Sequence, residues 1–279
     1  MLAALKSHWP EYLGEAGGLG LFMVSACLFG AFLFHPDSPA ARAIPDGLAR
    51  RLLMGLAMGL TAVGLIYSPW GRRSGAHLNP AVTLTFWRLG KIAGPDAIWY
   101  ALSQMLGGVA GVFAAATLIG SALADPTVRY VVTVPGTGGV AVAFLAEVII
   151  TFILMTTVLN ASNTARWAGF TGIFAGALVA MYIALEAPVS GMSMNPARTL
   201  ASAVPSGIWD ALWIYFLAPP IGMLLAAELF VRRRGLAGVF CAKLHHDSTS
   251  RCIFHCRFNE LAVERVMITP TAVVARPSA

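Results

Sequence analysis

The chain has 279 residues, of which 57% are hydrophobic and 11% are charged. Soluble domains carry about 25% charged residues, so this composition excludes a soluble globule and a disordered chain and indicates an integral membrane protein. The net charge of +6 and the four cysteines indicate neither a nucleic-acid partner nor a disulfide scaffold, because the arginines lie in short clusters between apolar runs.

Six apolar runs approach the roughly 20 residues that a helix needs to cross about 30 Å of hydrocarbon. In chain order these predicted spans are Tyr12–Phe34, Arg51–Tyr67, Ala97–Ala122, Val140–Leu159, Ala168–Leu185 and Ile208–Val231. Two further apolar pieces begin at Asn79 and Asn195 and are too short to cross, since each gives about nine helical residues, or roughly 13 Å. The predicted fold class is therefore an all-α membrane protein with six transmembrane helices and two re-entrant half-helices.

The chain repeats its own pattern. Each short piece begins with Asn-Pro-Ala, as Asn79, Pro80 and Ala81 and as Asn195, Pro196 and Ala197, after the second and the fifth full span. Three full spans separate equivalent points, and an odd number turns the second copy upside down in the membrane. The sequence thus predicts an inverted repeat in which the two half-helices enter from opposite faces and meet near the midplane.

Basic residues predict the orientation. An even number of spans puts both termini on one side, which we take as the cytoplasm. Nine lysines and arginines then lie inside and four lie outside, which agrees with the positive-inside rule. The inner set is Lys6, Arg72, Arg73, Arg88, Lys91, Arg166, Arg232, Arg233 and Arg234, and the outer set is Arg42, Arg50, Arg51 and Arg129. We expect a multi-pass protein of the plasma (inner) membrane.

The two Asn-Pro-Ala motifs indicate the chemistry of the predicted junction between the half-helices. Asn is a favoured N-cap whose side-chain oxygen accepts a backbone N–H, and Pro at the first helical position lacks an N–H that would stay unpaired. The amide groups of Asn79 and Asn195 are then left as hydrogen-bond donors at two helix N-termini, each with about half a positive charge. Such a junction repels cations. It also fixes the orientation of a passing water so that the water cannot relay a proton, while neutral solutes pass.

The sequence also resembles a known family. The segments HLNPAVTL (77–84) and SMNPARTL (193–200) are similar to the paired signature of the aquaporin and glycerol-facilitator (major intrinsic protein) family, as are SQMLGGVAG (103–111) and AEVIITFILM (146–155). The resemblance covers about residues 10–232 and implies six tilted helices, two re-entrant half-helices and one pore per subunit of a homotetramer. It also implies that Glu15 and Glu147, at equivalent points of the repeats, brace the re-entrant loops.

The same resemblance implies a selectivity filter around Arg198, which stands one turn into the second half-helix and donates to solutes while repelling cations. Matched by position to the second motif, its other members are Ile183, Met192 and Met58. Three apolar walls opposite one arginine favour a solute with an apolar and a hydroxyl face. Thr199 and Tyr215-Phe216 instead resemble the water-selective branch, so water, glycerol, urea, ammonia and metalloid hydroxides all stay open.

Residues 235–279 form a second predicted domain, a cytoplasmic tail rich in cysteine and histidine, after a channel domain over residues 1–234. Cys241, His245, Cys252 and Cys256 make a possible four-ligand set for zinc or iron. Because the cytoplasm is reducing, metal or free thiols are favoured over disulfides. Bound metal could fold the tail into a cap at the inner pore mouth.

The sequence leaves three classes of function to compare. The first is a passive channel for water or small neutral solutes that needs no cofactor and has the lipid bilayer as its surroundings. An alternating-access transporter also uses inverted repeats and broken helices, and a sensor would act through the tail, as would a channel gated by metal or redox state. An enzyme is not expected, because no nucleophile–base set or phosphate loop is visible.

Overall fold

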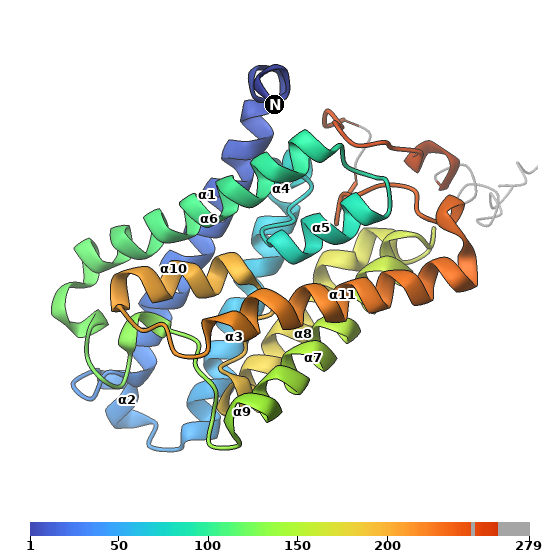
Figure 1. The fold of residues 1–279 in the computed structure, drawn as a ribbon. Coiled ribbons are helices and arrows are strands. Elements are labelled where there is room, and N and C mark those ends of the chain that lie inside the picture. Colours follow the sequence, from blue (N-terminus) through green and yellow to red (C-terminus); the bar gives the residue numbers. More distant parts are fainter. Residues whose placement is uncertain (247–248, 262–279) are drawn as a thin grey trace, which may run out of the picture.

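The computed structural model describes residues 1–246 and 249–261, and within these residues it is built of helices and irregular loops (Figure 1). Six of the helices in the described residues are long and apolar enough to cross a membrane, which confirms the predicted fold class. They are α1 (Leu2–Phe34), α3 (Gly47–Tyr67), α6 (Gly94–Ile119), α7 (Gly139–Ser162), α8 (Thr171–Leu185, preceded by the 3₁₀ turn η3, Ala168–Phe170) and α11 (Leu212–Arg234).

Two short helices lie between these spans. Helix α5 (Pro80–Arg88) has nine residues and α10 (Pro196–Ser206) has eleven. Further short helices and 3₁₀ turns lie in the connections: α2 (Pro39–Ala43), α4 (Pro69–Ser74), η1 (Gly120–Leu123), η2 (Arg129–Val131), α9 (Ala187–Ser190) and η4 (Leu236–Gly238). In Figure 1, α4, α5, the N-terminus and the described tail residues (235–246 and 249–261) gather at one end of the bundle, here called the tail face, and α2 and α9 lie at the other end.

Helix α1 is longer than the sequence predicts, since it begins at Leu2 and not near Tyr12. Its first turns pack against the beginning of α6, where the Trp99 indole donates to the Met1 carbonyl at 3.2 Å and His8 Nδ1 lies 2.7 Å from Asp96 Oδ1. These tertiary contacts extend the helix past the apolar run, which is the only part that a hydropathy pattern detects.

The helices pack in a way that follows the repeat. Helix α1 packs mainly on α6 in the first half and α7 on α11 in the second, while α3 and α8 join the halves. Glycines permit the close approach of the backbones: a Cβ on Gly107 would lie 2.1 Å from the Ala16 carbonyl oxygen, and one on Gly55 would lie 2.3 Å from the Ala180 carbonyl oxygen. Small residues at such crossings let membrane helices associate through van der Waals contact.

The described tail residues pack into the bundle. Val239, Cys241, Ala242, Leu244 and Phe254 are buried and belong to the same apolar cluster as the core of the bundle at the tail face. The division into two domains at residue 234 stays a prediction, and its last residues, 262–279, lie outside the described part together with residues 247–248.

Candidate functional site

The two half-helices begin at asparagines that are linked across the centre of the molecule. Asn79 Oδ1 accepts the Ala81 N–H at 2.8 Å, and Asn79 Nδ2 donates to the Met194 carbonyl at 2.8 Å. Asn195 Nδ2 in turn donates to the Leu78 carbonyl at 2.7 Å. Each asparagine therefore caps its own helix and holds the loop that leads to the other one, so that the two helix N-termini face each other.

These contacts set how many donors the junction offers. Asn195 Oδ1 accepts the N–H groups of Ala197 and Arg198 at 3.0 and 3.2 Å, so its oxygen is occupied, as that of Asn79 is. An asparagine amide has two N–H groups, and one of each pair is used by the opposite carbonyl. The sequence predicts that the whole amide is a free donor, whereas the loop-to-loop bonds leave one N–H per asparagine for a molecule in between.

Glu15 is buried at the first re-entrant loop and accepts four hydrogen bonds. Its Oε1 accepts from the Ser74 hydroxyl at 2.7 Å and from the His77 N–H at 3.0 Å. Its Oε2 accepts from the Leu78 N–H at 2.6 Å and from the Gln104 amide at 2.7 Å. Irregular backbone inside a membrane protein needs such internal partners, because lipid supplies none.

Glu147 occupies the equivalent place at the second re-entrant loop. Its Oε1 accepts from the Ser190 hydroxyl at 2.8 Å and from the Ser193 N–H at 2.7 Å, and its Oε2 accepts from the Met194 N–H at 2.8 Å. Both glutamates are fully buried. The two carboxylates thus make matching contacts in the two halves, as an inverted repeat requires.

Sequence reasoning missed a second layer of matched residues. The Tyr100 hydroxyl donates to the Ser74 carbonyl at 2.6 Å, and the Tyr215 hydroxyl donates to the Ser190 carbonyl at 2.5 Å. An alignment of the chain's two halves would have found both serines, since they stand at the same offset before their asparagines. The tyrosines are one residue out of register, which hides them from a simple alignment.

The loops adopt strained backbone at matching positions. Ala76 and Leu78 have φ angles of 54° and 49° before the first asparagine, and Met192 and Met194 have 49° and 57° before the second. The left-handed region costs about 1 kcal/mol or more for a non-glycine residue and persists where surrounding contacts over-determine it. Here the buried glutamates bind the N–H groups of the loops, and the turned backbone presents the Leu78 and Met194 carbonyls to the opposite asparagine.

One cavity of about 670 Å³ connects these features. Asn79 and Asn195 line it, and its wall continues to Arg50 and Arg51 at the face opposite the tail and to Leu244 at the tail face. The four residues expected in the filter all line the same cavity: Met58, Ile183, Met192 and Arg198. Their role as a filter stays a prediction.

Arg198 supplies a polar group to the wall of this cavity. It lies in the first turn of α10, and its buried Nη1 has no hydrogen-bond partner among the described residues. A buried guanidinium donor without a partner costs free energy, unless a molecule in the cavity accepts from it. Met58 and Met192 supply buried apolar surface to the same cavity.

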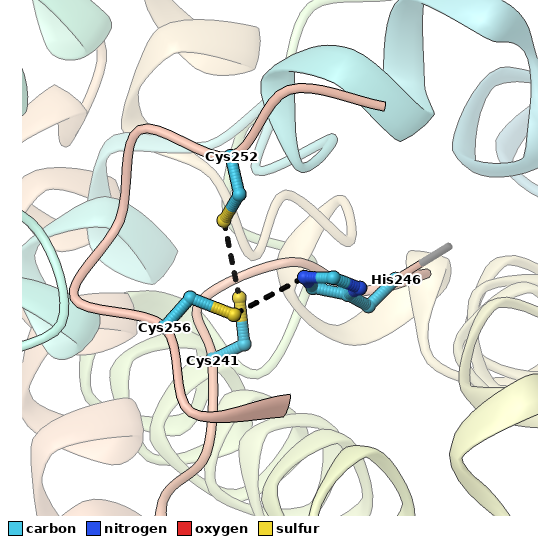
Figure 2. A group of neighbouring side chains, drawn as sticks. All are labelled: Cys241, His246, Cys252 and Cys256. Carbon is cyan, nitrogen blue, oxygen red and sulfur yellow. Dashed lines mark hydrogen bonds between the residues drawn. The ribbon is translucent and has the colours of Figure 1, made fainter. Parts of the chain in front are cut away.

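The tail forms a separate cluster of ligand-type side chains (Figure 2). Cys241, His246, Cys252 and Cys256 have ligand atoms that all lie within 4.8 Å of one another. The sequence predicts His245 in this set, but the structure places its neighbour His246 there. The ring of His245 instead packs on the ring of Tyr67, with centroids 4.5 Å apart.

Hydrogen bonds within the cluster shift the pKa values of two of its members. Hydrogen bonds from the Cys241 and Cys252 thiols lower the pKa of Cys256. Burial lowers the pKa of His246, but its hydrogen bonds with Cys252 and Cys256 outweigh burial and raise the pKa to about 9. His246 Nε2 lies 3.1 Å from Cys256 Sγ.

Comparison with known proteins places this arrangement among membrane channels. The sequence profile of the family described as "Major intrinsic protein" matches residues 4–230. Among solved structures, the aquaglyceroporin from Plasmodium falciparum superimposes with a TM-score of 0.65 at 22% identity, covering 80% of this chain and 95% of that one. At this identity the likeness concerns the fold.

The names of similar sequences include both aquaporins and a glycerol uptake facilitator. Aquaporin NIP6-1 of Arabidopsis thaliana is 37% identical over 66% of this chain and 59% of its own length. Aquaporin AqpM of Methanothermobacter marburgensis is 35% identical over 65% of this chain and 76% of its own. A glycerol uptake facilitator protein-like 6 from Lactiplantibacillus plantarum is 34% identical over 63% of this chain and 82% of its own. The match thus spans less than two thirds of the plant relative.

Proposed function

Since the chain belongs to the major intrinsic protein family, we propose that it is a passive channel for water and small neutral solutes. Members of this family are channels and not enzymes. The cavity lined by both asparagines and Arg198 is the proposed pore. Permeation through it needs no cofactor, because the side chains and backbone of the pore supply the contacts.

The opposed helix N-termini are the observation that carries this proposal. Two partial positive charges and one free N–H from each of Asn79 and Asn195 meet in the same cavity. A neutral solute offers an oxygen to these donors and passes, whereas a cation meets repulsion from the helix dipoles and from Arg198. A water bound through its oxygen at this point has no acceptor beside it to which a proton could move.

The apolar wall of the filter favours small solutes with both a hydroxyl and an apolar face. Arg198 Nη1 supplies a donor without a protein partner, and Met58, Ile183 and Met192 supply apolar contact. A water passing this point gives up several hydrogen bonds to other waters and gains few from the filter residues. We therefore expect glycerol or urea to permeate measurably beside water, and the names of the relatives from both branches support this expectation.

Assembly and location are parts of the same proposal. We infer a homotetramer in the plasma (inner) membrane, with both termini in the cytoplasm and without a nucleic-acid partner. The tail face, where α4, α5 and the described tail lie, carries the larger set of basic residues, and such a set favours the cytoplasmic side. The homotetramer is what the resemblance of the paired Asn-Pro-Ala motifs to the family implies.

Stopped-flow light scattering on proteoliposomes tests the function. Vesicles with the purified protein should shrink and swell faster than empty vesicles under water, glycerol and urea gradients, with solute flux linear in concentration and independent of ion gradients. Saturable, ion-coupled uptake would favour an alternating-access transporter. Vesicles as tight with the protein as without it would contradict a channel.

A further inference from the structure

The tail cluster has the geometry of a four-coordinate metal site (Figure 2). Zn–S bonds of about 2.3 Å in a tetrahedron place two sulfur ligands about 3.8 Å apart. Cys241 Sγ and Cys252 Sγ are separated by 3.7 Å, and all four ligand atoms, including His246 Nε2, fall within 4.8 Å of one another. All three cysteines are free thiols, so each can supply a thiolate.

The donor types select the class of ion. Three thiolates and one imidazole form a set found in structural zinc sites, and soft sulfur ligands disfavour calcium and magnesium, which prefer oxygen. The spacing, with four residues between Cys241 and His246, five before Cys252 and three before Cys256, differs from common zinc-finger patterns. The fold, and not a short motif, therefore brings the four side chains together.

Neighbouring groups support the ligands. The Phe258 N–H donates to Cys256 Sγ at 3.4 Å, and the Phe258 ring stacks on His246 with centroids 4.2 Å apart. The side chain of Lys91 lies beside the cluster, since its Nζ donates to the carbonyl of His255, the residue before Cys256, at 3.4 Å. Partners that orient ligands and balance their charge are a usual part of metal sites.

The buried part of the tail is ordered without regular secondary structure. Its residues 239–246 form no helix or strand, yet Val239 and Ala242 are completely buried and Lys243 is 2% exposed. Ordering irregular chain costs backbone and side-chain conformational entropy. A structural metal supplies that free energy in small folded units, because the site exists only in the folded state.

The same segment contacts the pore loop. His77 Nε2 donates to the Ala242 carbonyl at 2.9 Å, and the Leu244 N–H donates to the Gly75 carbonyl at 3.0 Å. His77 and Gly75 belong to the re-entrant loop that ends at Asn79. The side chain of Leu244 lines the pore cavity at the tail face. Cys241, a ligand of the cluster, therefore directly precedes in the sequence the residues that contact the pore loop and line the pore.

We propose that Cys241, His246, Cys252 and Cys256 bind one Zn²⁺ ion and that the ion holds residues 241–244 as a cap that narrows the tail-face mouth of the pore. Bound zinc fixes the loop between the first two ligands, and this loop contains Leu244. Without zinc the loop is released and the mouth widens. The cap rests on the proposed channel function, whereas metal binding does not.

Metal analysis of the purified full chain tests the site. Elemental analysis after gel filtration should find about one zinc ion per chain. Removal with a strong chelator followed by Co²⁺ should give the visible absorption of tetrahedral cobalt with thiolate ligands. An apo protein that takes up neither ion, or one whose tail cysteines are joined in a disulfide, would overturn the metal site. Iron in excess of zinc would overturn the choice of ion.

Matched variants separate the ligands from their neighbours. His246→Ala and Cys252→Ser should weaken zinc binding by more than the roughly 10–100-fold typical of losing a group that only orients a ligand. His245→Ala and Cys27→Ala should keep the zinc, since neither residue belongs to the cluster. Loss of zinc in His245→Ala with retention in His246→Ala would overturn the assignment. Gel-filtration profiles, together with the chelated wild type, exclude misfolding as the cause.

Water permeability of the same samples tests the cap. Chelated wild-type protein and Cys252→Ser should both conduct water faster per channel than zinc-loaded protein, and adding zinc back should reverse the effect only in the wild type. Leu244→Ala should keep its zinc and also conduct faster. Equal permeability with and without bound zinc would overturn the cap and leave the metal site standing. Absence of any water conduction in all samples would instead count against the channel function.

Discussion

Single buried residues decide the conformation of the re-entrant loops. Glu147 is fully buried and accepts three hydrogen bonds from the loop that leads to Asn195. A carboxylate suits this place because both of its oxygens accept and neither donates. The neighbouring left-handed residues Met192 and Met194 need such a partner, since nothing in their own side chains favours that backbone.

Replacing Glu147 with glutamine tests this requirement. Both carboxylate oxygens face backbone N–H groups, so either placement of the glutamine amide sets an NH₂ against a donor. We expect Glu147→Gln to lower the free energy of unfolding by about 2–3 kcal/mol. A thermal unfolding series in detergent measures it. Glu228→Gln, which removes a half-exposed pair with Arg88, is the control and should lose less than about 1 kcal/mol.

Arg198 is the second residue whose effect can be isolated. Its buried Nη1 has no protein partner among the described residues, so its removal leaves no protein acceptor unpaired there. We expect Arg198→Val to fold, to pass larger polyols faster than the wild type, and to leak cations that the wild type excludes. Flux of a polyol series and an ion-sensitive dye in liposomes measure both. Unchanged selectivity in a correctly folded variant would contradict a filter at Arg198.

At the scale of elements, the fold depends on how closely the helix backbones approach each other. Gly107 and Gly111 of α6 face the backbone of α1, where a Cβ would lie 2.1 and 2.3 Å from carbonyl oxygens. No shift of a side chain relieves a clash with backbone. Helices α1 and α6 also position Glu15 and Gln104, so their spacing determines the first re-entrant loop.

A pair of alanine variants tests the helix crossing. We expect Gly107→Ala to force α1 and α6 apart and to reduce both melting temperature and water permeability. The matched control is Gly64→Ala in α3, where a Cβ meets nothing within 4 Å. There alanine should be neutral or stabilising by up to about 1 kcal/mol, because it is the better helix former. Equal effects at both positions would contradict the crossing.

At the scale of the whole molecule, the inverted repeat places two equal loops at one point from opposite faces. The matching contacts of Glu15 and Glu147 and of Tyr100 and Tyr215 reflect this symmetry. The symmetry is broken at the tail face, where residues 235–246 and 249–261 pack on one mouth alone. The two ends of the pore therefore differ in what can regulate them.

Fusion proteins test the orientation of the molecule. Both termini should lie in the cytoplasm, so green fluorescent protein fused after the tail should fluoresce and alkaline phosphatase at the same point should be inactive. The matched fusion uses the connection near Arg42, on the opposite face, and should give the reverse pattern. Active phosphatase after the tail would show that the positive-inside count misassigned the faces.

The sequence by itself determined the spans, the two half-helices and the inverted repeat. Hydropathy, Asn-Pro caps and an odd number of intervening helices are local or countable features, and each depends on physics that acts along the chain. The family resemblance added Glu15, Glu147 and Arg198 for the same reason, since they stand at fixed offsets from recognisable motifs.

Only the tertiary structure decided contacts between distant segments. It showed that Asn79 and Asn195 each spend one N–H on the opposite loop, that α1 extends to Leu2, and that His246 rather than His245 joins the cysteines. Two adjacent histidines are equivalent in composition, and only the path of the folded chain turns one of them toward Cys256. A property that depends on the direction of a side chain relative to a distant segment has no local signal in the sequence.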